Sequence, residues 1–268
     1  MTRQRHPRVS HRTIAACAAA VAVVLALASS ALAAPLATLK ARFSPDQLRR
    51  STTVFFGFAF SSPEPLKTME LRLPAGMTFT HSQLGLEPCQ PLQLQEYGVD
   101  GCPLDSKLGR GKGFAEVPYG PLFEKVIDES ANVTVLLGPI TDQHMTALFW
   151  VEGIYPVGLE KIFVGTIRTT PRPFGTAIRV EVPLDQAWTE GPLVGIRRFS
   201  STIGPAGLTY TRHENGRTIH FTPEGLDTPE TCPQGGFPVA AYFTWWTGGG
   251  ASAKTYVPCP LPTGASLG

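Results

Sequence analysis

The sequence predicts an all-β protein made of one or two antiparallel β-sandwiches braced by disulfides. Apolar and polar residues alternate with a period of two along most of the chain, which is typical of strands with one buried face. Glycine and proline, 27 and 25 of the 268 residues, separate these short segments. Charged residues make up 16% of the chain, well below the roughly 25% of an average globular protein, and no long amphipathic helical pattern interrupts the strands.

Ten segments have the composition of strands, being short, rich in β-branched or aromatic residues and bounded by turn residues. They are residues 52–60, 69–74, 132–138, 146–153, 161–169, 176–183, 208–214, 217–223, 238–246 and 253–258. Strands of this number and spacing are typical of antiparallel sandwiches. The best helix candidate is residues 44–50, where Ser44 would cap one or two turns that begin with Pro45.

The first 33 residues have the features of a secretory signal peptide. Four arginines precede an apolar run over residues 15–28, which is short for a membrane span, and Ala-Leu-Ala at 31–33 forms a small-residue cleavage site. We therefore expect export and cleavage before Ala34, the alternative being an uncleaved signal anchor. The mature chain would then be secreted and would have no membrane span.

Removal of this leader changes the charge of the chain. It takes away four of the 23 basic residues and no acidic one, which leaves 19 basic residues against 21 acidic ones, a formal charge of −2. The basic character of the whole chain therefore comes from the leader. Because no basic stripe remains, the sequence argues against nucleic-acid binding.

Residues 34–262 are expected to form the sandwich region, either as one large sandwich or as two small ones with a possible seam near 119–130. Residues 263–268 are expected to be a disordered tail. Leu-Pro-Thr-Gly at 261–264 resembles a sortase signal, but it lacks the variable residue, the hydrophobic stretch and the basic tail of such a signal. Covalent anchoring to a cell wall is therefore not predicted.

Four cysteines remain after cleavage, and an even number in an exported protein indicates disulfides. Three connectivities are possible, and the short separations favour Cys89–Cys102 and Cys232–Cys259. Each bond would contribute about 3 kcal/mol by the chain-entropy model. The alternative, a structural zinc site, is disfavoured because no two cysteines have the close spacing of zinc ligands.

The segment LGRGKGF at 108–114 has the glycines and basic residues of a phosphate-binding loop. A Walker loop needs glycine at position 106 and serine or threonine at 113, where this chain has Ser106 and Gly113, and Phe114 replaces the third glycine of a dinucleotide fingerprint. The segment is better interpreted as a bulged start of a strand, where glycines allow positive φ or close backbone approach.

Asn-Gly at 215–216 is the preferred sequence of a type I′ hairpin turn. Such a turn places His213 opposite Thr218 and His220 opposite Thr211, so that the two histidines are diagonal neighbours on one face. His213 and His220 would form half a metal site. No third ligand is visible nearby, so a solvated polar face is the plainer interpretation, and no cofactor is predicted.

The sequence offers little evidence for a hydrolase. Asp142 and His144 form an acid and a base near the start of a strand, but no nucleophile motif lies near them. Neither the G-x-S-x-G nucleophile elbow nor the H-E-x-x-H zinc motif occurs. A hydrolase would therefore depend on His144, His213 or His220 meeting a carboxylate or nucleophile inside a pocket.

The strands at 238–246 and 253–258 are expected to pair and to present two different faces. One face, which includes Phe243 and Trp245, belongs in the core. The candidate binding residues of the other face are Tyr242, Trp246, Lys254 and Tyr256. Exposed, coplanar rings would form a platform for stacking on sugars, whereas in the alternative interpretation a loop covers the rings or they simply suit a strand.

Three motifs carry a resemblance to uncharacterised secreted β-rich proteins of high-GC Gram-positive bacteria. They are a strand ending in LPxG, a CPxxSxxGxG loop and a terminal CP…GG…CP hairpin. The matching positions after the LPxG strand are Cys102, Pro103, Ser106, Gly109, Gly111, Cys232, Pro233, Gly235, Gly236, Cys259 and Pro260. The resemblance implies secretion and the Cys232–Cys259 pair, and it implies no activity. Trp246 departs from the pattern by adding aromatic surface.

The sequence therefore leaves three hypotheses for the function. The first is an exported, non-catalytic β-sandwich protein with a structural or interaction role at the cell exterior. The second is a module that binds a carbohydrate or another cell-envelope polymer through the aromatic face of the C-terminal hairpin. The third is a hydrolase without a recognisable motif.

Overall fold

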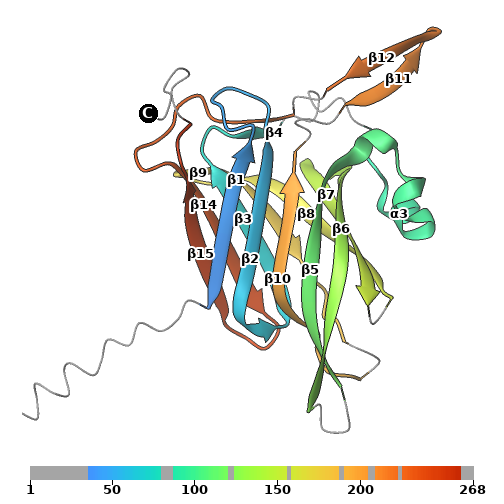
Figure 1. The fold of residues 1–268 in the computed structure, drawn as a ribbon, viewed down its shortest axis with the longest axis vertical. Coiled ribbons are helices and arrows are strands. Elements are labelled where there is room, and N and C mark those ends of the chain that lie inside the picture. The colour runs from blue at the N-terminus through green and yellow to red at the C-terminus, as the bar shows by residue number, and fades with distance from the viewer. Residues whose placement is uncertain are drawn as a thin grey trace, which may run out of the picture. The chain divides into compact units, whose positions relative to one another are not determined.

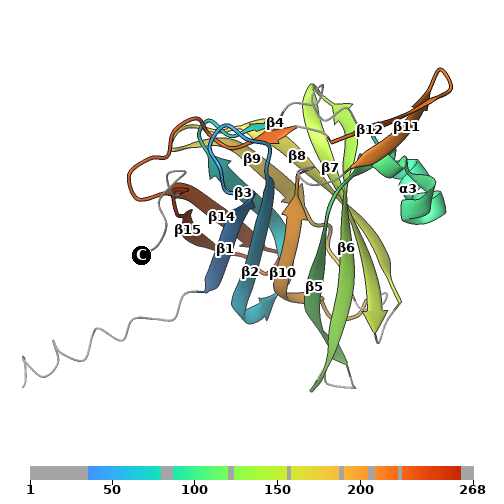
Figure 2. The ribbon, with the colours of Figure 1, turned by 45° about the horizontal axis from the view of Figure 1, so that its top comes forward.

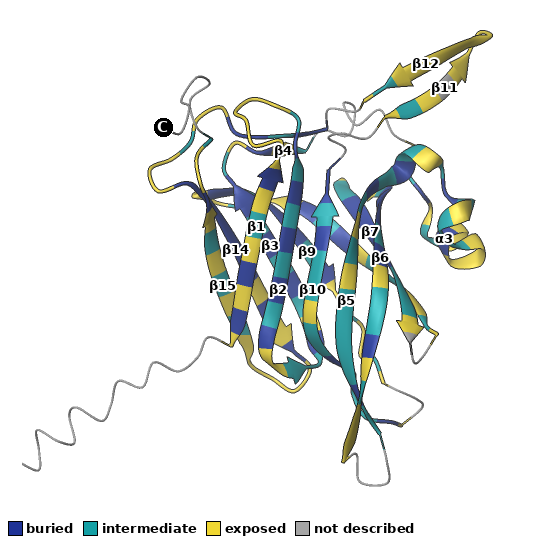
Figure 3. Cartoon of the chain, in the orientation of Figure 1, coloured by how far each residue is buried: buried dark blue, intermediate teal, exposed yellow. Residues whose placement is uncertain are grey.

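Strand β2 (Thr53–Glu64) shows how the period-two pattern builds the core. In the computed structural model Phe56, Phe58 and Phe60 are buried, while the residues between them are partly exposed. Figure 3 shows the same alternation as stripes along most strands. The structure describes residues 36–79, 87–119, 124–155, 158–186, 190–204, 209–222 and 225–260. The predicted leader and the predicted tail lie outside these residues.

Eleven strands form one antiparallel sheet, which confirms the predicted fold class. Their order across the sheet is β1 (Ala37–Ser44), β2, β10 (Gly195–Ile203), β5 (Lys107–Tyr119), β6 (Lys125–Thr141), β7 (His144–Tyr155), β8 (Glu160–Thr169), β9 (Phe174–Glu181), β3 (Leu66–Pro74), β14 (Phe237–Trp245) and β15 (Gly250–Val257). Two short pairs lie outside it, β4 (Thr78–Phe79) with β13 (Leu226–Asp227), and β11 (Tyr210–Glu214) with β12 (Arg217–Phe221).

The large sheet curls until its two edge strands, β1 and β15, lie in contact (Figures 1 and 2). The result is a nearly closed, barrel-like sheet whose opposite walls face each other across one core. Phe60 of β2 packs edge-on against Phe243 and Trp245 of β14, with ring centroids 4.8 Å apart in both pairs. Because β2 and β14 are not neighbours in the sheet, these rings join opposite walls.

All ten predicted strand segments are strands in the structure. For β5 only the bulged start at 108–114 was predicted, and β1, β10 and the two-residue strands β4 and β13 were not predicted. The segment near 119–130, proposed as a seam, lies within one hairpin: Tyr119 ends β5, Lys125 begins β6, and the two residues pair.

The predicted helix at residues 44–50 is wrong. Ser44 ends β1, and residues 45–50 form a turn in which Arg49 has a positive φ of 55°, outside the helical region. The buried side chain of Thr52 donates to the carbonyl oxygen of Pro45 at 3.0 Å, and that of Thr228 donates to Gln47. These side chains donate hydrogen bonds to carbonyl oxygens that, in a helix, would accept them from backbone N–H groups.

A short helical excursion that was not predicted covers the outer face of β6 and β7. It consists of α3 (Pro91–Tyr97), η1 (Gly98–Gly101) and η2 (Leu104–Ser106). Leu94 of α3 packs with Leu136, Leu148 and Trp150 in a second, smaller core. The sequence hides this helix because it is only seven residues long, too short for a periodic apolar pattern.

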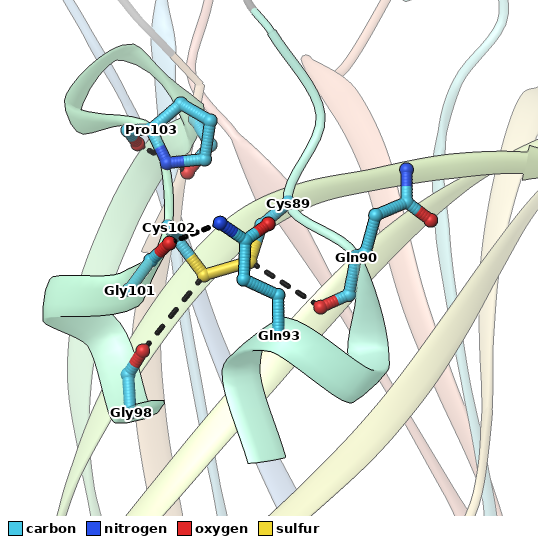
Figure 4. The surroundings of a disulfide bond; sticks show 8 residues. Cys89, Gln90, Gln93, Gly98, Gly101, Cys102 and Pro103 are labelled. Atoms are coloured by element: carbon cyan, nitrogen blue, oxygen red, sulfur yellow. Dashed lines mark hydrogen bonds between the residues drawn. A yellow bond between two sulfur atoms is a disulfide. The ribbon is translucent and has the colours of Figure 1, made fainter. Parts of the chain in front are cut away.

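Both predicted disulfides are present. Cys89 and Cys102 are buried and close the helical excursion across its base, as Figure 4 shows. The backbone N–H of Cys89 also donates to the carbonyl oxygen of Leu137 at 2.9 Å, which fixes the excursion to β6. Cys232 and Cys259 join the loop before β14 to the residues after β15.

Candidate functional site

A cavity of about 130 Å³ lies on the inner side of the curled sheet. Its wall comes from strands β2, β10, β5, β6, β7, β8, β9 and β3, and from the loops beside them. Four lining residues are charged and the others are apolar or glycine. The apolar residues are Phe58, Leu66, Met69, Phe114, Ala115, Val117, Ala131, Val133, Phe149, Val151, Leu159, Phe163, Val180, Val182, Val194, Ile196 and Phe199. An apolar cavity of this kind favours apolar molecules and excludes water, which needs several polar partners.

The cavity meets solvent at an ion pair. Lys161 Nζ lies 3.0 Å from Asp185 Oδ1, and the two side chains are 46% and 28% exposed although both line the cavity. Arg198, which also lines it, places its guanidinium carbon 3.8 Å from the centroid of the Phe114 ring. The opening therefore carries charge, whereas the interior is apolar.

Glu129 is an acidic residue in the apolar part of the wall. It lies on β6 opposite Ala115, in the inward register shared by Ala131 and Val133, and is only 4% exposed. Its carboxyl group gives the wall a polar group able to accept a hydrogen bond from a ligand. The cavity thus combines a large apolar surface with one buried polar contact, the usual arrangement of a small-molecule site.

The candidate binding face of the C-terminal hairpin is exposed, which the hypothesis of a binding platform requires. Tyr242, Trp246 and Tyr256 are 39%, 39% and 51% exposed, and Lys254 is also exposed. Pairing of β14 with β15 places Lys254 opposite Ala240 and Tyr256 opposite Pro238. The rings are therefore not covered by a neighbouring loop.

Each of the three rings nevertheless has a cation near one face. The guanidinium carbon of Arg72 lies 4.4 Å from the centroid of Tyr242. The ammonium groups of Lys67 and Lys254 lie 4.8 Å and 4.9 Å from the centroids of Trp246 and Tyr256. A neutral sugar would have to displace these cations to stack on the same faces.

Trp246 also connects separate parts of the sheet. Its indole Nε1–H donates to the carbonyl oxygen of Val182 at 3.1 Å, and its backbone N–H donates to that of Pro65 at 2.9 Å. These bonds link the turn after β14 to the end of β9 and to the turn between β2 and β3. Because Val182 lines the cavity, Trp246 helps to hold the wall of the cavity in place.

The glycine-rich segment 108–114 is part of β5, as expected for a strand rather than a phosphate loop. A register shift between Lys107 and Gly109 forms the predicted bulge. A Cβ atom on Gly109 would overlap the carbonyl oxygen of Thr202, and one on Gly111 would overlap that of Ser200. These glycines are required by close approach of the β10 backbone.

The histidines lie away from the cavity. Hairpin β11–β12 has the predicted register, with His213 opposite Thr218 and His220 opposite Thr211. Each Nδ1 is hydrogen-bonded to the facing threonine hydroxyl, at 3.1 Å for His213 and 3.0 Å for His220. His144 begins β7, and within the part of the chain that the structure describes no three metal-ligating side chains gather into a site.

Comparisons with protein-family models, with curated proteins and with solved structures give no match for this chain. Among the described residues, no helix is long and apolar enough to cross a lipid bilayer. The two disulfides are consistent with an extracellular location, since such bonds persist in oxidising compartments.

Sequence reasoning missed the cavity and its charged residues. The signal for Glu129 was present, because extending the inward register of Val133 and Ala131 back along β6 places an acidic residue in the core. Lys161 likewise shares the register of Phe163 on β8. No pattern in the sequence indicated that Lys161 pairs with Asp185, because this contact depends on the path of the loop that follows β9 and packs beside β8.

Proposed function

We propose that this chain is an exported, non-catalytic binding protein that holds a small apolar molecule in the interior cavity. The observation that carries the proposal is the cavity wall, which is apolar apart from Glu129 inside and the charged opening. Burial of apolar surface is worth about 25 cal/mol per Å², so such a wall favours an apolar ligand over water. The leader, the disulfides and the resemblance to secreted bacterial proteins support export to the cell exterior.

The size of the cavity limits the ligand. Its volume of about 130 Å³ is close to the ~150 Å³ of engineered apolar cavities that stay dry and bind benzene-sized molecules. The ligand, or the part of it that enters, is therefore a single ring or a short branched alkyl group. Since small ligands gain at most about 1.5 kcal/mol per heavy atom, a six-carbon ring should bind no more tightly than a Kd of about 0.3 µM.

A hydrolytic role has less support than binding. The three histidines that a hydrolase would require, His144, His213 and His220, are not among the described residues that line the cavity. Two of the charged residues at the opening, Lys161 and Asp185, form an ion pair with each other rather than a nucleophile with its base.

Calorimetric titration of the mature chain with benzene, toluene and naphthalene tests the proposal. We expect saturable binding of the single-ring compounds and weaker binding of naphthalene. Ala131→Leu, which fills part of the cavity, should abolish binding, whereas Ala59→Leu on β2, outside the cavity lining, should not. Equal binding by both variants, or no binding by the parent chain, would refute the proposal.

A further inference from the structure

We propose that the outer face of β15, β14, β3, β9 and β8 binds a linear acidic polysaccharide with one acidic group in each disaccharide. This site is independent of the interior cavity because its side chains point away from the core. The residues of this outer strip are Lys254, Tyr256, Tyr242, Arg72, Glu70, Arg179, Glu181, Arg168 and Thr166.

Strand register aligns three cations of the outer strip in one row. Lys254 pairs with Ala240, which pairs with Arg72, and Arg72 pairs with Ala177, which pairs with Arg168. The cations therefore stand on every second strand, with a small alanine between them. Because adjacent strands lie about 4.8 Å apart, the charges repeat at intervals of about 10 Å.

The next row of paired residues, Tyr242, Glu70 and Arg179, lies beside the row of cations. It adds an aromatic ring and a carboxylate that contacts two guanidinium groups. Tyr242 pairs with Glu70, and Glu70 pairs with Arg179. One carboxylate oxygen of Glu70 lies 2.6 Å from Arg72 Nε, and the other lies 3.7 Å from a terminal nitrogen of Arg179. Glu70 thus holds both arginines in place, and preorganised guanidinium groups lose less entropy when they bind an anion.

Positive charge exceeds negative charge on this face. The four cations Lys254, Arg72, Arg179 and Arg168 stand against Glu70, Glu181 and, at the start of β8, Glu160. Within the described residues, Lys254 and Arg168 have no acidic partner within ion-pair distance. The excess occurs although the predicted mature chain is slightly acidic, so the outer strip is a local feature complementary to an anion.

A hollow of about 330 Å³ lies at the β8 end of the outer strip. Arg168, Arg179 and Glu181 line it together with Thr166, Ile162, Val164 and Pro183. A sugar ring has the same mixture of apolar C–H faces and polar edges. The hollow therefore suits one sugar unit whose acidic group contacts Arg168, since Glu181 already pairs with Arg179.

The rings favour an acidic polymer over a neutral one. Tyr242 and Tyr256 already have Arg72 and Lys254 near their faces, so a neutral sugar gains little by displacing them. An acidic sugar instead pairs with the cation that already lies near the ring. The repeated spacing of the cations across five strands selects a linear chain over a single sugar.

Binding to a labelled hyaluronate oligosaccharide, which has one carboxylate per disaccharide, tests this proposal by fluorescence anisotropy. We expect binding at low salt that weakens as added salt screens the charges. The methyl ester of the same oligosaccharide should bind at least tenfold more weakly. Arg168→Gln/Lys254→Gln should lose about tenfold in affinity, as expected for two exposed ion pairs.

The control is Arg110→Gln/Lys112→Gln, which removes the same charge from β5, outside the outer strip. It should bind hyaluronate within twofold of the parent chain. Equal losses in the two double variants would overturn the proposal, as would equal binding of the ester or of a single-stranded DNA of matched length. Ala131→Leu should leave hyaluronate binding unchanged, so failure of this site and failure of the cavity are distinguishable.

Discussion

Gly111 lies directly against the backbone of Ser200, where any side chain on residue 111 would overlap the Ser200 carbonyl oxygen. This close approach of β5 to β10 explains why a segment with the appearance of a phosphate loop is rich in glycine. The glycines serve the packing of two strands, and the basic residues Arg110 and Lys112 between them point outward to solvent.

Gly111→Ala should therefore destabilise the fold by about 2–4 kcal/mol, because the β5 and β10 backbones must separate to admit the methyl group. Gly113→Ala on the same strand is the matched control. A Cβ there meets its nearest neighbour, a ring carbon of Phe199, at 3.9 Å, which is an ordinary contact. Urea unfolding should show a large loss for the first variant and less than 1 kcal/mol for the second.

The Cys89–Cys102 bond should protect Trp150 from solvent. Replacing both cysteines by serine should lower stability by about 3 kcal/mol and loosen the helical excursion that covers Trp150. Trp150 emission should then shift to longer wavelength under native conditions. Replacing both Cys232 and Cys259 by serine should lower the free energy of unfolding by a similar amount without this shift. A shift in that variant would contradict the assignment of Cys89–Cys102 as the bond that keeps Trp150 covered.

Tyr210 should make stability fall at high pH. Its hydroxyl donates to the carbonyl oxygen of Lys107 at 2.6 Å, and burial, assisted by the Asp105 carboxylate, raises the pKa of Tyr210 to about 12. Since the pKa is near 10 in the unfolded chain, the folded state binds this proton more tightly. The contribution is complete below pH 10 and is lost as pH rises through 12.

Comparison with Tyr210→Phe isolates this effect from other titrating groups. At pH 8 the parent chain should be about 1 kcal/mol more stable than the variant, because of one hydrogen bond. The difference should shrink between pH 10 and 12 and then reverse. A constant difference in urea midpoint across this range would show that Tyr210 is not the titrating group.

Trp246→Phe should cost about 1 kcal/mol, because the indole N–H no longer bonds the Val182 carbonyl while the ring remains near Lys67. Tyr256→Phe is the control, since it removes a polar group from an exposed ring on the same hairpin. Its stability in urea should change by less than 0.5 kcal/mol. Equal effects would mean that the Val182 bond contributes nothing to the fold.

Much of the fold was accessible from the sequence because period-two alternation specifies which side chains face the core. Strands 52–60 and 238–246 show this well, since their alternating aromatic residues meet across the interior. Strand β10 was missed because Arg197, Arg198 and two serines break the apolar pattern. The turn after β1 resembled a helix because its contacts with Thr228 are distant in sequence.

The candidate sites were less accessible. Alternation assigns residues to a face, but it does not show whether opposing side chains fill the space between the walls, so the cavity could not be predicted. The outward register of Tyr242 and Lys254 was predictable from one hairpin. The row that continues through Arg72 to Arg168 was not, because it depends on the order of five strands.

Diffraction from crystals soaked with iodobenzene is the most direct test of the interior cavity as a ligand site, since iodine gives an anomalous signal that locates the molecule. We predict a single strong peak among Phe149, Val180 and Ala131, with no change in the surrounding strands. The peak should be absent in Ala131→Leu. Iodine bound only elsewhere on the protein, or side chains that close the cavity in the crystal, would contradict the account.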